Sequence, residues 1–208
     1  MSRKAVILTL AIVVVAIGAY AAWPRHADLR GFEPAEIARL ETAMWRDYYD
    51  KRYVALFGHL YELSRTQSGF APLDSIRIAL SAAQAAKAFQ PTGSRDAADA
   101  ALPQLVTYYR LLASAVPICF DVTEAARLEL DWWQARREAV DPEQYGVIVA
   151  RVAAVTYGKP VDDPSLLMSG IGCADAMAYR DALGQAMTEI ECRLRRAYSS
   201  LKAAVAGG

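Results

Sequence analysis

The pattern of apolar and polar positions divides the chain into one continuous apolar run and a series of amphipathic segments. Residues 5–23 are apolar without interruption and directly follow Arg3 and Lys4. As a helix rising about 1.5 Å per residue, this run covers roughly 28 Å, close to the ~30 Å hydrocarbon core of a bilayer. The pattern predicts a single N-terminal transmembrane helix, a signal-anchor at residues 1–23, with Trp23 as an interfacial aromatic.

A cleaved signal peptide is the alternative interpretation of the same run. Residues 19–21, Ala-Tyr-Ala, have the small-x-small pattern of a cleavage site after Ala21. The run is longer than the usual signal core of about 7–15 residues, however, and Pro24 follows the cut. Because a short basic tail before a first helix usually stays in the cytoplasm, we expect a single-pass protein of the bacterial cytoplasmic (inner) membrane, with its helical domain on the periplasmic side.

The rest of the chain shows helical periodicity and almost no alternation typical of strands. Residues 24–33 are interpreted as a juxtamembrane linker and residues 34–208 as one helical domain. The predicted fold is therefore all-α, with a bundle of about six to seven helices after the anchor. The expected helices cover about 34–67, 73–89, 94–116, 121–139, 141–157, a segment starting near 163, and 188–206.

Local start signals support several of these boundaries. Asp121 with Glu124 has the spacing of a capping box, and Asp141 precedes a proline at the first helical position. Pro103 lies inside the third expected helix, so either this helix kinks there or a new helix begins.

The charge balance argues against a polyanionic partner. The chain has 23 basic and 23 acidic residues, and removing Arg3 and Lys4 leaves 21 basic residues against 23 acidic ones. No basic field is therefore available to hold a nucleic acid, and we expect none as a partner.

The number and spacing of the cysteines exclude two classes of redox protein. The three cysteines, Cys119, Cys173 and Cys192, form no C-x-x-C or C-x-x-C-H motif, which removes thioredoxin-like chemistry and covalent c-type haem attachment. One disulfide between Cys173 and Cys192 is possible outside the cytoplasm. The alternative is three buried cysteines that act as small apolar residues.

Charged and aromatic residues share helix faces in two main segments. Around residues 41–59 and 129–136, large aromatics recur with Glu, Arg and His at helical spacing, where a purely structural face would more often carry Leu, Ile and Val. The resulting polar and aromatic cluster comprises Glu41, Trp45, Tyr48, Arg52, His59, Arg77, Tyr109, Arg110, Glu129, Trp133 and Arg136.

This cluster has two interpretations. In the first, it lines a pocket between the first, third and fourth expected helices: Glu41 and Glu129 supply carboxylates, Arg52, Arg77 or Arg110 receives an anionic group, and aromatic rings stack on a ligand. In the second, it is a buried Glu–Arg network that fixes helix register, since buried charges persist only when they are paired.

Metal and nucleophile motifs are incomplete. The chain has two histidines, His26 and His59, and His59 precedes Glu62 in the reverse order of the Glu-x-x-His motif of di-iron bundles. A thiol nucleophile would need His59 as its base. We therefore assign no catalytic, cofactor-binding or metal-binding residue, expect no cofactor, and consider an enzyme less favoured than a non-enzyme.

Two short motifs resemble a known group of sequences. The residues E-x-x-M-W-R-x-Y-Y at 41–49 and L-E-L-x-W-W at 128–133 resemble an uncharacterised group of bacterial membrane-anchored helical proteins. This resemblance covers residues 41–137 and implies no activity and no residue roles.

The leading functional hypothesis from the sequence is a membrane-tethered helical accessory or interaction protein, such as a subunit of a larger membrane complex. It would contact lipid through residues 5–23 and would bind a protein partner. The alternative is a small-ligand-binding protein or enzyme that uses an interhelical pocket containing Glu41, Arg52, His59 and Glu129.

Overall fold

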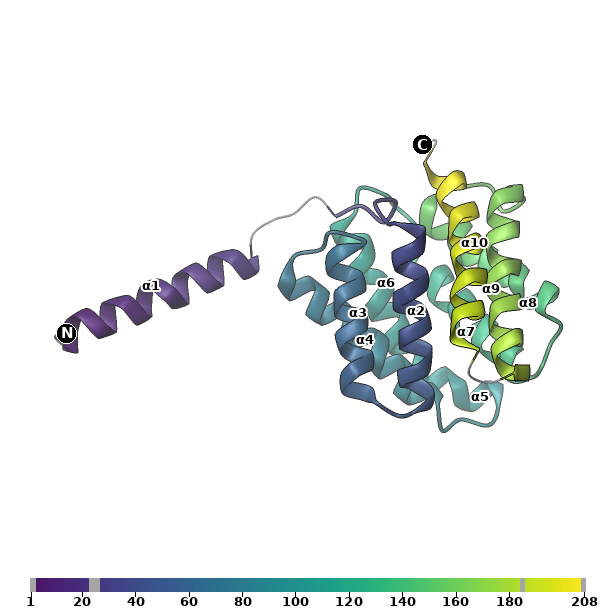
Figure 1. Cartoon of the computed structure of the whole chain (residues 1–208), viewed down its shortest axis with the longest axis horizontal. Helices are drawn as coiled ribbons and strands as arrows, with labels where there is room; N and C mark the ends of the chain where they lie inside the picture. The colour runs from purple at the N-terminus through teal and green to yellow at the C-terminus, as the bar shows by residue number, and fades with distance from the viewer. Residues whose placement is uncertain (1–2, 23–26, 184–185, 207–208) are drawn as a thin grey trace.

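The computed structural model describes residues 3–22, 27–183 and 186–206, and the regular secondary structure in these ranges is helical throughout (Figure 1). The all-α part of the predicted fold is therefore confirmed.

The first helix, α1 (Arg3–Ala22), projects from the group formed by the other helices (Figure 1), and it contacts α4 (Pro72–Phe89). Its large apolar side chains, Leu8 and Val15 among them, are exposed. Within the described ranges, no helix combines the length and the apolar character that crossing a bilayer requires. Two cations occupy the first turn of α1, and Trp23, the last residue of the expected span, lies outside the described residues together with Pro24 and His26.

The prediction of a transmembrane signal-anchor is therefore wrong. The assignment that depended on it, a single-pass inner-membrane protein with a periplasmic domain, is corrected with it. Contact of residues 5–23 with lipid stays a prediction.

The remaining long helices form a closed ring. Each packs against the next one along the chain, with the short elements between α4 and α6 passed over, and α10 returns to pack against α2. Helices far apart in sequence thereby become neighbours (Figure 1). In ring order these helices are α2 (Pro34–Tyr49), α3 (Tyr53–Thr66), α4 (Pro72–Phe89), α6 (Leu102–Ala115), α7 (Val122–Arg137), α8 (Pro142–Tyr157), α9 (Pro164–Leu183) and α10 (Met187–Val205); the short α5 (Arg95–Ala98) and a 3-10 helix (Asp99–Ala101) connect α4 to α6.

The predicted long helix over 34–67 is in fact two helices. The chain turns at residues 50–52, where Lys51 has a φ of 57° and the backbone N–H of Arg52 donates to the Asp47 carbonyl at 2.8 Å. A left-handed residue ends an α-helix because it takes the next N–H groups out of register. Helix α3 then packs back against α2, so residues beyond 52 do not continue the face that carries Glu41.

Several helix starts follow their local sequence. The Asp121 carboxylate accepts the backbone N–H groups of Thr123 and Glu124 at 2.8 and 2.9 Å, and Asp141 accepts that of Glu143 at 2.9 Å. Pro103 stands in the first turn of α6, so a new helix begins there and the third expected helix does not continue through it. These positions confirm the predicted caps.

The contact between α8 and α9 depends on glycines. A Cβ placed on Gly146 would lie 2.6 Å from the Cα of Ile171, and one on Gly170 would overlap the Gly146 carbonyl oxygen. Two residues further along α9, a Cβ on Gly172 would lie 3.0 Å from the Cβ of Ala197 on α10. The three helices α8, α9 and α10 therefore approach closely enough to close that side of the ring.

The three cysteines are free. Cys119 is exposed, Cys173 is buried and Cys192 is partly buried. The possible disulfide between Cys173 and Cys192 is therefore not formed, and the alternative of three buried cysteines holds for Cys173 alone.

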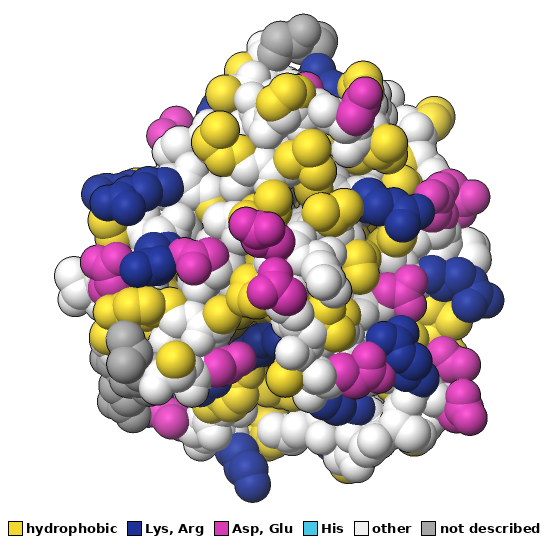
Figure 2. Space-filling model, turned by 90° about the vertical axis from the view of Figure 1, so that its right-hand side faces the viewer, with side chains coloured by type: hydrophobic (Ala, Val, Ile, Leu, Met, Phe, Trp, Pro, Cys, Tyr) yellow, Lys and Arg dark blue, Asp and Glu magenta, His cyan; other side chains and the backbone are white. Residues whose placement is uncertain are grey.

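The outer surface carries both signs of charge. Figure 2 shows basic and acidic side chains interspersed with apolar ones over the face that it presents. Many of these charges form exposed pairs, such as Arg95 with Glu138 at 2.5 Å and Arg193 with Glu189 at 3.0 Å.

Candidate functional site

A cavity of about 490 Å³ lies inside the ring of helices. All of the helices α2, α3, α4 and α6 to α10 contribute side chains to its wall, and the volume falls within the roughly 300–1,000 Å³ typical of small-molecule sites. The wall is mainly apolar and rich in aromatic rings. Its aromatic residues include Trp45, Tyr48, Phe70, Tyr108, Trp132 and Trp133.

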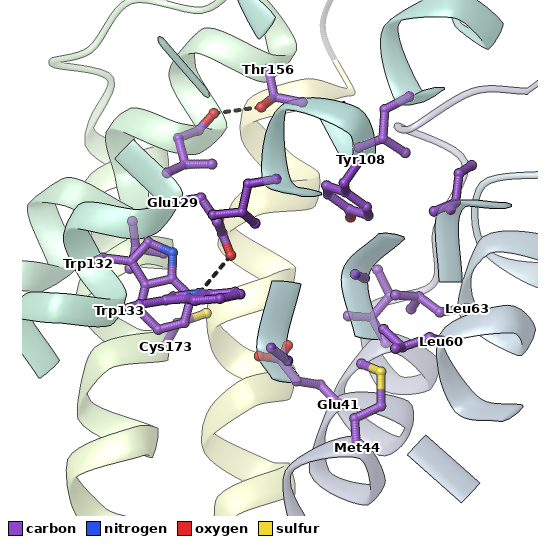
Figure 3. Close-up of a pocket in the computed structure, with 18 of the residues that line it drawn as sticks. Glu41, Met44, Leu60, Leu63, Tyr108, Glu129, Trp132, Trp133, Thr156 and Cys173 are labelled. Atoms are coloured by element: carbon purple, nitrogen blue, oxygen red, sulfur yellow. Dashed lines mark hydrogen bonds between the residues drawn. The ribbon is translucent and has the colours of Figure 1, made fainter. Parts of the chain in front are cut away.

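Glu129 on α7 points into this cavity (Figure 3). Its carboxyl group accepts a hydrogen bond from Trp133 Nε1 at 3.0 Å and another from the Tyr109 hydroxyl at 3.0 Å. Trp133 lies one turn further along α7, whereas Tyr109 comes from α6. Burial raises the pKa of Glu129, and these hydrogen bonds together with one from Trp132 partly oppose the increase.

Glu41 on α2 supplies the second carboxyl group (Figure 3). The hydroxyl of Tyr198 on α10 donates a hydrogen bond to it. Burial raises the pKa of Glu41 to about 7, the hydrogen bond from Tyr198 opposes this, and the negative charge of Glu129 raises it further. Half of the Glu41 carboxyls would therefore carry a proton near neutral pH.

Neither carboxyl group has a basic partner. Within the described part of the chain, Glu41 and Glu129 form no ion pair, and their donors are neutral hydroxyl and indole groups. Both residues are only partly buried, and they line a space large enough for a ligand. The second interpretation of the cluster, a Glu–Arg network, does not describe these two residues.

Arg136 closes one part of the wall together with Tyr49. Its guanidinium donates to the Tyr49 hydroxyl at 2.6 Å and to both carboxylate oxygens of Asp181 at 2.9 and 3.0 Å. Arg180 stacks over the Tyr49 ring at 3.1 Å and also contacts Asp181. The Arg136 charge is thus already paired within the protein.

Two other residues of the predicted cluster gather around Asp47, outside the cavity. Asp47 is 2% exposed, and Arg52 Nη2 lies 2.8 Å from its carboxylate. His59 Nε2 lies 3.4 Å from the other carboxylate oxygen, and His59 Nδ1 lies 3.8 Å from Glu62. These contacts join α2 to α3 around the turn at residues 50–52.

The structure therefore divides the predicted cluster. Arg77 forms an exposed pair with Asp74 at 3.4 Å, and Arg110 is exposed on α6, so neither reaches the cavity. The members that line the cavity are Glu41, Trp45, Tyr48, Tyr109, Glu129, Trp133 and Arg136; those that do not are Arg52, His59, Arg77 and Arg110.

The predicted cluster left out several wall residues, among them Tyr108, Trp132, Tyr198 and Cys173. Tyr108 and Trp132 each adjoin a predicted member, and a wider reading of these two aromatic pairs would have included them. Tyr198 and Cys173 had no such neighbour, because they reach the cavity only through the closure of the ring by α9 and α10.

Cys173 is a wall residue with little nucleophilic character. Burial raises the pKa of its thiol well above the usual value, and the nearby Glu41 charge raises it further. The thiolate, which is the nucleophilic form, is therefore disfavoured. Among the described residues, no cluster of three or more His, Cys, Asp and Glu side chains is placed to hold a metal ion.

Comparison with known proteins gives no match for this chain among protein-family models, curated proteins or solved structures.

Proposed function

We propose that this protein binds a small organic molecule in the cavity enclosed by its helical ring. The observation that carries the proposal is a cavity of about 490 Å³ whose wall combines aromatic rings with two carboxyl groups. Small-molecule sites have this composition, an apolar wall with a few polar groups that orient the ligand.

The packing energetics support a binding role over a purely structural one. Protein interiors are close-packed, and voids larger than a water molecule are few. A cavity of this size removes contacts that the surrounding Leu, Trp and Tyr side chains would otherwise make, and such cavities destabilise a fold. A bound ligand would restore these contacts and would stabilise the folded state by mass action.

A neutral fluorescent probe provides the test. N-phenyl-1-naphthylamine, which brightens in apolar surroundings, should bind the full chain saturably at one site. Ala82 lies in the cavity wall on α4, so Ala82→Phe fills part of the cavity and should weaken binding at least about tenfold.

The matched control adds the same ring outside the cavity. Gln84 is exposed on the same helix, and Gln84→Phe should leave probe affinity unchanged. Absence of saturable probe binding to the unmodified chain, or equal probe affinity in the two variants, would contradict the proposal.

The protein partner predicted from the sequence stays a prediction.

A further inference from the structure

We propose that the ligand is an organic ammonium cation, an amine with an attached apolar group, whose charged end is held by Glu41 and Glu129 among the aromatic rings of the cavity. This inference rests on the proposed binding function and specifies the chemical class of its ligand.

Among the described residues, Glu41 and Glu129 have no cationic partner. A buried acidic group elsewhere in the fold is paired: Asp47 is 2% exposed, and Arg52 lies 2.8 Å from its carboxylate. In contrast, the hydrogen bonds to Glu129 come from a phenol and an indole. Burying an ionised carboxylate without a cation is costly, and a ligand ammonium group would supply that cation.

The aromatic rings around the two carboxyl groups also favour a cationic ligand. The faces of Trp and Tyr rings carry negative potential and attract cations, most strongly where water is excluded. Trp132 and Trp133 lie beside Glu129 (Figure 3). Trp45 follows Glu41 by one turn of α2 and also lines the cavity. Aromatic walls with nearby carboxylates are the usual recognition chemistry for ammonium groups.

An anionic ligand fits this cavity less well. Arg136 is the basic side chain of the wall, and both Asp181 and Tyr49 already accept hydrogen bonds from it. An anion would also face repulsion from Glu41 and Glu129. A neutral ligand would leave the ionised forms of Glu41 and Glu129 without a counter-ion.

Binding of a cation is expected to release a proton. Burial and the charge of Glu129 raise the pKa of Glu41 to about 7 in the empty protein. A positive charge beside Glu41 would favour its ionised form, so a cation and a proton compete for the same site. The titratable groups that interact with the two carboxyls from the packed helices are Tyr198 on α10, Cys173 on α9, and Tyr108 and Tyr109 on α6.

The test compares three probes that share a phenylethyl skeleton. Phenethylamine is a cation, 2-phenylethanol is neutral and 3-phenylpropanoate is an anion at about pH 8, where Glu41 is mostly ionised. Calorimetric titration of the full chain measures the affinity of each probe directly. We expect the amine to bind at least about tenfold more tightly than the alcohol and the anion to bind most weakly.

The carboxyl groups are then removed one at a time. Glu41→Gln and Glu129→Gln should each reduce the amine-to-alcohol affinity ratio at least about threefold, whereas Glu143→Gln on the exposed surface of α8 should not change it. The amine-to-alcohol affinity ratio of the unmodified chain still tests the proposal if one of these variants fails to fold.

The outcomes separate the two proposals. Equal binding of amine and alcohol, or tighter binding of the anion, would overturn the ammonium assignment while the binding function stands. Absence of any binding by the naphthylamine and by all three probes would overturn both.

Discussion

The hydroxyl of Tyr198 on α10 donates a hydrogen bond to the carboxyl group of Glu41 on α2, and this bond joins the last helix of the ring to the first. The two residues are 157 positions apart in the sequence, and both line the cavity. One polar contact thus links closure of the fold to the electrostatics of the candidate site.

Removing this hydroxyl should weaken ring closure. Tyr198→Phe keeps the ring but loses the hydrogen bond, so we expect the free energy of unfolding to fall by about 1 kcal/mol. The pKa of Glu41 should also rise above about 7, because the bond favours its ionised form. Urea unfolding and titration of Glu41 by NMR measure the two effects.

A double-mutant cycle checks that the effect passes through this pair. If Tyr198 and Glu41 interact, the loss in Tyr198→Phe combined with Glu41→Gln should differ from the sum of the single losses. Strict additivity of the two substitutions would contradict the described contact.

The stability of the ligand-free protein should depend on pH through Glu41. Its pKa is about 7 in the folded protein against 4.5 as the ordinary value, so the folded state binds the proton more tightly. This contribution to stability is fully present below about pH 4.5 and is lost as the pH rises through about 7, a change of roughly 1–3 kcal/mol. Glu129, whose pKa is also raised, acts in the same direction.

Thermal unfolding across this pH range tests whether the stability falls as the pH rises. Burial raises the pKa values of the neighbouring Tyr198 and Cys173 well above their usual ranges, so these groups stay neutral throughout. Glu41→Gln should flatten the decline in melting temperature between about pH 5 and pH 8, and Glu143→Gln should not. A melting temperature that rises with pH in both variants alike would rule out this role for Glu41.

The glycine at the crossing of α8 and α9 should be sensitive to a methyl group. Gly146→Ala would place a Cβ 2.6 Å from the Ile171 Cα, so the helices must separate, and we expect a loss of about 2 kcal/mol or more. Gly58 is the control, because a Cβ there meets nothing within 4 Å and Gly58→Ala should stabilise α3 by about 0.5–1 kcal/mol. Similar effects at the two glycines in urea unfolding would argue against the close crossing.

Asp47 should stabilise the α2–α3 turn more than an exposed acid does. Asp47→Asn removes the charge that faces Arg52 and His59 in a site 2% exposed, and we expect a loss of about 1–3 kcal/mol. Asp74→Asn removes only the exposed pair with Arg77, which should cost at most about 0.5 kcal/mol. Equal losses in chemical denaturation would show that the buried pairing is unimportant.

The parts of the fold that the sequence could predict are local. The caps at Asp121 and Asp141 and the start of α6 near Pro103 depend on a few adjacent residues, so their patterns can be read directly. The turn at Lys51 was missed because neither glycine nor proline marks it. Periodicity alone allowed a single helix through that point.

The site was predictable only as far as its helix faces. Glu41 and Glu129 were proposed together because each lies on an aromatic face, and both line the cavity. Arg52 left that face when α3 turned back on α2, and Tyr198 could not be proposed because its place depends on the pairing of α10 with α2. The spacing of residues within one helix does not indicate which distant helix it packs against.

The prediction of a membrane span was also wrong. The length and composition of residues 5–23 suggested a bilayer span. The helix that forms there begins with Arg3 and Lys4, and no described helix has the apolar length to cross a bilayer.

The most direct test of the central claim is a crystal structure of the full chain soaked with phenethylamine. The account predicts that α10 packs against α2 and that electron density for the amine fills the cavity between Glu41 and Glu129. A structure in which α10 packs elsewhere, or in which side chains fill the interior and leave no such cavity, would contradict it.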